Sequence, residues 1–144
     1  MARKFSQASR DQRTFSSVMR DANFYVNMHG IATPANLASG LFLPAPGENL
    51  RHDFYITQII ITGGFTYHWE LDPAYDPINS RLGPEHMRLY GTFMEGILVS
   101  LPLTVRLKCP KDRQILIRAD STVGSPSGTG NSRFQLIGYY EPDR

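Results

Sequence analysis

A series of short apolar segments separated by turns rich in glycine and proline constrains this chain more than any other feature of its sequence. Five of these segments have the composition or the two-residue period of β-strands, at residues 54–61, 65–71, 103–109, 115–120 and 134–140. Short strands at this spacing are typical of a sandwich or a barrel. The eight Phe and seven Tyr residues favour the same interpretation, because aromatic side chains pack well on a pleated surface. The sequence therefore predicts an all-β fold, a single antiparallel β-sandwich.

Two of the segments indicate where they lie in a sheet. Residues 54–61 are apolar at successive positions, so we expect a central strand covered on both faces. Gly63 and Gly64 follow it and predict a break or a bulge. In residues 103–109 apolar side chains alternate with Thr, Arg and Lys, which predicts a half-buried strand.

Turn signals divide the rest of the chain. Residues 72–83 contain two Asp-Pro pairs and lead to a Gly-Pro pair, so they predict a long loop. Pro84 suits the first position of a short helix that extends to Tyr90, with Glu85 near its N-terminus. Residues 124–130 are rich in Gly and Ser and predict an exposed hairpin tip.

The 144 residues fit one domain with an N-terminal arm, residues 1–23, and a sandwich, residues 24–144. A domain of this length can bury roughly 70% of the surface of its unfolded chain, so it needs no metal or disulfide to fold. The arm is polar, but Phe15, Val18, Met19 and Ala22 recur at helical spacing. We expect an extended or partly helical arm, because so short a helix is stable only against an apolar surface.

Charge is divided unevenly between arm and body. Residues 1–20 carry five basic side chains against Asp11 alone, a net charge of +4, whereas the ten basic and twelve acidic side chains of the remainder leave −2. Opposite signs favour docking of the arm on the body of a neighbouring subunit, and contact with nucleic acid is the less favoured alternative. The arm residues that we expect at this interface are Arg3, Lys4, Arg10, Arg13, Phe15, Val18, Met19 and Arg20.

Sequence motifs of enzymes are missing. The chain has no phosphate-binding glycine loop and no paired cysteines. Residues 124–128 resemble a nucleophile elbow, but Pro126 stands where the serine is needed. Cys109 is the single cysteine, so we expect a buried small apolar residue and no intramolecular disulfide. We therefore predict that the protein is not an enzyme and holds no cofactor.

Two groups of polar side chains have the chemistry of metal ligands. His68 and Glu70 lie two apart on one predicted strand, so they share a face, and His86 or His52 would have to supply a third ligand. The His-x-His pair of metal-binding cupin-like sandwiches is lacking, and we predict a surface or interface role instead.

The second group is a set of oxygen donors in the predicted loop. Asp72, Asp76 and Asn79 offer the chemistry that Ca²⁺ prefers. Their spacing matches no EF-hand, and Asp-Pro is itself a turn device. We predict no metal at this loop.

Aromatic residues offer a different kind of site. Tyr67, Trp69, Tyr75 and Tyr90 are a candidate contact surface, because aromatic faces suit sugar rings and partner surfaces alike. This makes a carbohydrate- or ligand-binding module the alternative function. Burial of Trp69 in the core is the competing interpretation.

No run of 18 apolar residues is present, and no apolar stretch of signal-peptide length follows the first residues. We therefore expect no membrane contact, with synthesis and folding in a cytoplasm.

The order of arm, strand-rich body and closing hairpin resembles the single jelly-roll proteins of viral particles. These are the small capsid, decoration and head-fibre proteins of bacteriophages. The resemblance is carried by residues 103–120, Leu-Thr-Val-Arg-Leu-Lys-Cys-Pro-Lys-Asp-Arg-Gln-Ile-Leu-Ile-Arg-Ala-Asp, and by residues 134–141, Phe-Gln-Leu-Ile-Gly-Tyr-Tyr-Glu. It implies a jelly-roll-like sandwich and a non-enzymatic structural subunit, forming homo-oligomers and contacting other virion proteins. The expected location is the virion, assembled in the host cytoplasm, at the capsid, its decoration or the head-to-tail joint.

Overall fold

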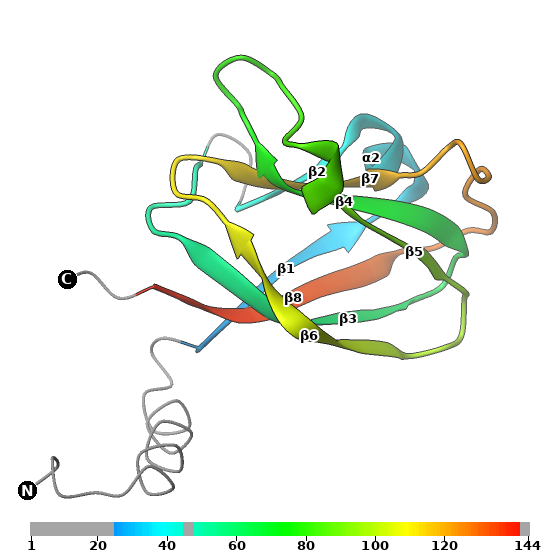
Figure 1. Ribbon diagram of the computed structural model, residues 1–144. Coiled ribbons are helices and arrows are strands. Elements are labelled where there is room, and N and C mark those ends of the chain that lie inside the picture. The colour runs from blue at the N-terminus through cyan, green and yellow to red at the C-terminus, as the bar shows by residue number, and fades with distance from the viewer. Residues whose placement is uncertain (1–24, 45–47, 142–144) are drawn as a thin grey trace, which may run out of the picture.

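The chain folds into two antiparallel sheets of four strands each, packed face to face (Figure 1). The computed structural model describes residues 25–44 and 48–141. The predicted all-β sandwich is thereby confirmed, whereas the predicted arm, residues 1–23, lies outside the described residues.

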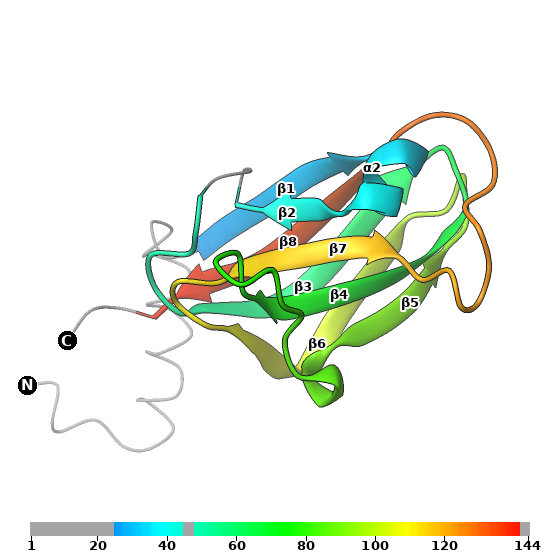
Figure 2. The same ribbon diagram turned by 90° about the horizontal axis from the view of Figure 1, so that it is seen from above.

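Sheet A contains strands β1, β8, β3 and β6 in that order, and sheet B contains β2, β7, β4 and β5. Seen from above, sheet B lies over sheet A (Figure 2). In chain order the elements are β1 (Tyr25–Ala32), α2 (Pro34–Ser39), β2 (Leu41–Leu43), β3 (Phe54–Gly63), β4 (Tyr67–Tyr75), the 3₁₀ helix η3 (Glu85–Met87), β5 (Leu89–Phe93), β6 (Val99–Cys109), β7 (Gln114–Ala119) and β8 (Ser132–Tyr140).

The pairing of the strands shows how the chain is wound. β1 pairs with β8, β2 with β7, β3 with β6 and β4 with β5, so the chain is one long hairpin. Two further pairings, β3 with β8 and β4 with β7, roll that hairpin into two sheets. This eight-stranded, two-sheet arrangement is that of a jelly roll.

The core lies between the inner faces of the sheets. Phe54, Ile56, Ile59 and Ile61 point inward from β3 and are fully buried, and each contributes about 1.5–3 kcal/mol to folding. The predicted central position of this strand is confirmed. Its predicted coverage on both faces is not, because Ile60 and its outward neighbours are only half-buried. A two-layer sandwich covers one face of each sheet.

The register of β3 shifts at Thr57, which is the extra residue of a β-bulge against β8. The Thr57 hydroxyl donates to the carbonyl of Ile137 at 3.1 Å. Gly138 lies across from this bulge, and a Cβ atom there would meet the Tyr55 carbonyl oxygen at 1.9 Å. Only glycine allows the two backbones to approach so closely.

The predicted loop over residues 72–83 is too long, since β4 continues to Tyr75. Pro73 is tolerated in the strand because the register against β7 shifts between Asp72 and Tyr75. The turn proper is closed by paired backbone hydrogen bonds between Asp76 and Arg81.

Both helices differ from the prediction. The helix expected from Pro84 to Tyr90 is the single turn η3, because Leu89 already pairs with Leu71. The helix α2 was not predicted from the sequence, although Thr33 and Pro34 are typical of a helix start. Its capping box uses Asn36 where Glu or Gln is usual, and α2 packs on β7.

Strand β6 follows the predicted alternation only in part. Leu103 and Leu107 pack against the core and Cys109 is fully buried, but Val105 is 81% exposed. Four residues, 103–106, bulge out opposite the single residue Thr57. β6 is also an edge strand, so its apolar side is not fully covered.

We predict that Gly138→Ala lowers the free energy of unfolding by about 3 kcal/mol, because the added methyl collides with backbone. Denaturant unfolding followed by Trp fluorescence measures the change. Gly64→Ala is the matched control, since the nearest atom to its new Cβ is 3.7 Å away. Equal stability of the two variants would contradict the close approach at Gly138.

Candidate interaction surface

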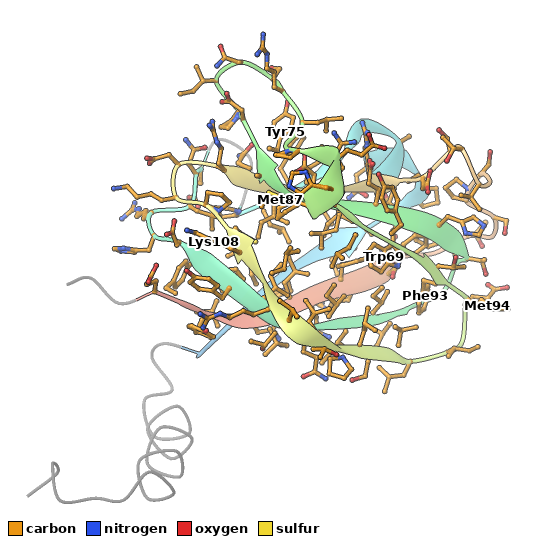
Figure 3. All side chains as sticks on the ribbon, viewed as in Figure 1. Trp69, Tyr75, Met87, Phe93, Met94 and Lys108 are labelled. Carbon is orange, nitrogen blue, oxygen red and sulfur yellow. The ribbon has the colours of Figure 1, made fainter. Side chains whose placement is uncertain are left out.

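The four aromatic residues expected to form a contact surface do not lie together. Tyr67 and Trp69 point into the core from β4, where they are 0% and 2% exposed. Tyr75, labelled in Figure 3, packs against Phe42, whereas Tyr90 is largely open, at 50% exposure. Inward positions alternate along β4, so residues 67 and 69 share the buried side. The predicted aromatic platform is therefore corrected, in favour of the core position for Trp69.

Both buried rings are held by specific neighbours. The Tyr67 hydroxyl is 2.8 Å from the Ser132 hydroxyl, and burial raises the pKa of Tyr67 to about 12. Trp69 meets Phe134 edge to face, with ring centroids 5.3 Å apart. The indole lies across Gly91, where a Cβ atom would come within 2.4 Å of it.

The side chains considered as metal ligands are engaged in other contacts. His68 Nδ1 lies 2.7 Å from the Thr92 hydroxyl, and Glu70 pairs with arginines. Within the described ranges, no three His, Cys, Asp or Glu side chains are grouped to hold a metal ion.

Asp72 and Asp76 organise the turn after β4. Asp72 is 1% exposed and accepts hydrogen bonds from the backbone N–H groups of Ala74, at 3.0 Å, and Gly83, at 2.8 Å. A hydrogen bond from the Asn79 side chain lowers the pKa of Asp76, which also pairs with Arg113 at 3.1 Å. These oxygens therefore serve as turn devices.

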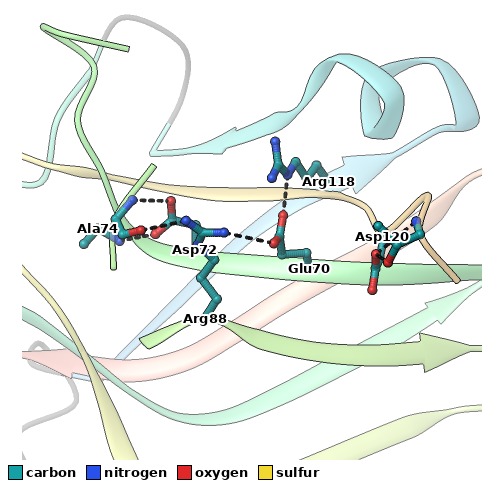
Figure 4. A network of polar contacts seen from close by, with 8 residues as sticks. Glu70, Asp72, Ala74, Arg88, Arg118 and Asp120 are labelled. Carbon is teal, nitrogen blue, oxygen red and sulfur yellow. Dashed lines mark hydrogen bonds and ion pairs between the residues drawn. The ribbon is translucent and has the colours of Figure 1, made fainter. Parts of the chain in front are cut away.

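A buried carboxylate with two arginines lies on the outer face of sheet B (Figure 4). The Glu70 side chain is 8% exposed; it accepts a hydrogen bond from Arg118 Nε and lies 3.5 Å from an Arg88 nitrogen. Arg88 also donates to the carbonyl of Gly83 at 2.9 Å. Removing charges from water is costly unless they are paired in this way.

This cluster borders a cavity of about 620 Å³, which Tyr90 and Asp120 also line. The sequence analysis missed the cluster. The register of the strands brings the cluster together, since Glu70 lies directly opposite Arg118 on β7 and Tyr90 on β5. Pairing of opposite charges across strands stabilises a sheet, but the register is known only from the fold.

Four large exposed apolar side chains follow one another closely along the chain where β5 ends and β6 begins. We call this surface the β5–β6 patch; it consists of Met94, Ile97, Leu98 and Leu101, which are 57%, 52%, 66% and 40% exposed. Met94 projects from the end of the sandwich in Figure 3. Exposed apolar side chains that gather in one place mark interaction sites more often than scattered ones do. The sequence analysis missed this patch as well.

Cys109 is fully buried, as predicted for a small apolar residue. Burial raises the pKa of its thiol above the ordinary range, so the reactive thiolate is disfavoured. The predicted interface residues of the arm, Arg3 to Arg20, lie outside the described part of the chain. Among the described residues, no helix has the length and apolar character needed to span a bilayer.

We predict that Glu70→Gln lowers the free energy of unfolding by about 2 kcal/mol, because Arg88 and Arg118 lose their carboxylate. The partial exposure of Arg118, at 38%, keeps the effect below that of a fully buried pair. Denaturant unfolding measures it. Glu85→Gln, which changes an exposed carboxylate on the same cavity, is the control and should leave the midpoint unchanged. Equal midpoints for the two variants would refute the role of the ion pairs.

Comparison with models of known protein families, with curated proteins and with solved structures gives no match in any of the three cases.

Proposed function

We propose that this protein is a non-enzymatic structural subunit of a bacteriophage-type virus particle. It assembles with copies of itself and with other virion proteins, as a capsid, decoration or head-to-tail joining protein. The observation that carries this proposal is the β5–β6 patch, which leaves four large apolar side chains open at one end of a jelly roll. A fold hosts many functions, so the jelly roll alone does not indicate this role, and the exposed apolar surface is what favours it.

The patch favours assembly for a physical reason. Covering each of its side chains would contribute roughly 1 kcal/mol or more, at about 25 cal/mol per Å² of apolar surface. The basic arm supplies further apolar side chains for assembly, with Phe15, Val18 and Met19 on one side of its predicted helix. Burial of these three contributes about 1.5–3 kcal/mol each, while ordering costs about 1 kcal/mol or more per residue. Hydrogen bonds and ion pairs in the assembly must therefore supply the remainder.

The test is the mass of the purified full chain in solution over a wide concentration range. We expect a closed oligomer: a trimer or pentamer would place the subunit on the capsid surface or at a vertex, and a six- or twelve-fold ring at the neck or tail. A chain that stays monomeric at high concentration and binds no virion component would refute the proposal.

A truncated chain starting at residue 24 separates the role of the arm from that of the sandwich. We expect it to stay folded as a monomer with an unchanged melting temperature, because the described residues of the two sheets already form a buried apolar core. It should not assemble. Normal assembly of the truncated chain would show that the arm is dispensable, and unfolding would show that the arm is an integral part of the sandwich.

The cavity beside Glu70 favours a second candidate function, binding of a small carbohydrate. Tyr90 offers an exposed ring, and Asp120, Ser121 and Thr122 offer hydrogen-bonding groups at the same cavity. Sugars bind by such a combination of aromatic and polar contacts. A glycan array should then give hits that Tyr90→Ala abolishes. An array without hits would eliminate this candidate and leave the first untouched.

A further inference from the structure

We propose that the β5–β6 patch is the docking site for the N-terminal arm of a neighbouring copy of this chain. Phe15, Val18 and Met19 of one copy pack on Ile97, Leu98 and their neighbours in the next. This inference rests on the proposed role as a self-assembling subunit and names the contact by which the subunits join.

The chemistry of the arm suits the patch. Apolar residues at positions 15, 18, 19 and 22 have the i, i+3, i+4, i+7 spacing by which an amphipathic helix places anchors in an apolar surface. Met94 offers a flexible side chain that adapts to such anchors. Glu95 follows the patch residue Met94 in the sequence and is exposed, with no ion pair among the described residues, and residues 1–20 of the arm carry a net charge of +4.

The edge strand next to the patch favours docking of a helix over addition of a strand. Pro102 cannot donate a hydrogen bond from its backbone nitrogen, and residues 103–106 bulge out of the ladder of β6. Proline and bulges are the devices that prevent another strand from pairing with a sheet edge. The apolar side chains beside this edge nevertheless remain open, which suits a partner that contributes side chains and satisfies its own backbone.

The arm leaves the sandwich at the end opposite to the patch. Tyr25, the first residue of β1, pairs with Tyr139, which in turn pairs with Tyr55 near the start of β3. Val99, which follows the patch residue Leu98, pairs with Ile61 near the other end of β3. Figure 1 shows the start of β1 and the β5–β6 connection at opposite ends of the molecule.

The distance between these two ends separates a neighbour's arm from the chain's own. Six residues along β3 and three strand spacings across sheet A place the patch about 25–30 Å from Tyr25. Residues 15–19 precede Tyr25 by only six to ten positions, which spans about 9–15 Å as a helix. An arm that is helical through residue 22, as its apolar spacing predicts, is too short to reach its own patch, which favours the arm of a second copy as the occupant.

Such a contact joins one end of a subunit to the opposite end of the next. Contacts of this head-to-tail kind generate rings when the rotation closes. The proposal therefore predicts cyclic oligomers, in which every subunit both donates an arm and receives one.

Disulfide trapping tests the contact in the full chain. Two single variants, Phe15→Cys and Leu98→Cys, are mixed and oxidised, and the product is separated by mass under non-reducing conditions. We expect covalent dimers in the mixture and at least about tenfold less in either variant alone, since the effective concentration at a docked site is high. The native Cys109 adds little background, because its thiol is fully buried.

Ile78→Cys replaces Leu98→Cys as the matched control, since Ile78 is 81% exposed on the turn after β4. Cross-linking of Phe15→Cys to residue 78 as readily as to residue 98 would overturn the proposal. So would self-linking of Leu98→Cys alone, which would mean contact between two patches. A Phe15→Cys/Leu98→Cys double variant that forms only an intrachain disulfide would place the arm on its own sandwich and overturn it too.

A second pair of variants keeps the two proposals distinct. Leu98→Asp should weaken assembly at least about tenfold, whereas Ile78→Asp should leave it unchanged, because both sites are exposed and only one lies in the patch. An unmodified chain that assembles, together with a Leu98→Asp variant that assembles equally well, would refute the docking site and leave the structural role standing. An unmodified chain that never assembles would refute both.

Discussion

The packing of two inner sheet faces against each other is the interaction on which the rest of this structure depends. Sheet A contributes the side chains of β3 and β8, and sheet B contributes aromatic rings from β4 and β5. The Tyr67 ring is fully buried in this contact, 4.6 Å from the ring of Phe65 and 5.5 Å from that of Phe93, measured between centroids. Tilted arrangements of this kind add to the hydrophobic term. The strands of both sheets are arranged so that their apolar side chains are buried between the sheets and water is excluded from this layer.

That constraint also explains where the surface is left open. The β5 strand has five residues, whereas β6, at the same open side of the sandwich, has eleven. A short strand cannot cover a long one, so apolar side chains of β6 such as Leu101 and Val105 stay exposed beyond the contact. The β5–β6 patch has a different origin, because Met94, Ile97 and Leu98 lie in the connection after the end of β5 and before the start of β6. A subunit that hides this surface in an assembly needs no change of fold to do so.

On the outer face of sheet B, the buried carboxylates must be paired with hydrogen-bond donors or cations. Glu70 and Asp72 are buried in β4, and both oxygens of each carboxylate find partners: arginines for Glu70 and backbone N–H groups for Asp72. These bonds tie β7 and the turn after β4 to β4 itself. Because the carboxylates of Glu70 and Asp72 make these contacts, they are not available as the metal ligands that the local sequence suggests. The polar face of sheet B is therefore explained in large part by the requirements of folding.

The sequence by itself determined the class of fold, the central position of β3 and the burial of Cys109. Those features depend on local composition: apolar runs, a two-residue period and turn residues such as Gly63 report directly on extended backbone and on its ends. Only the tertiary structure decided that Trp69 lies in the core while Val105 is exposed, and that Glu70 meets Arg118. Periodicity places side chains on one side of a strand but does not say whether another layer covers that side. Cross-strand partners likewise depend on the register, which is fixed by the pairing of strands far apart in the sequence. The local sequence around Glu70 or Arg118 does not specify that these two residues pair.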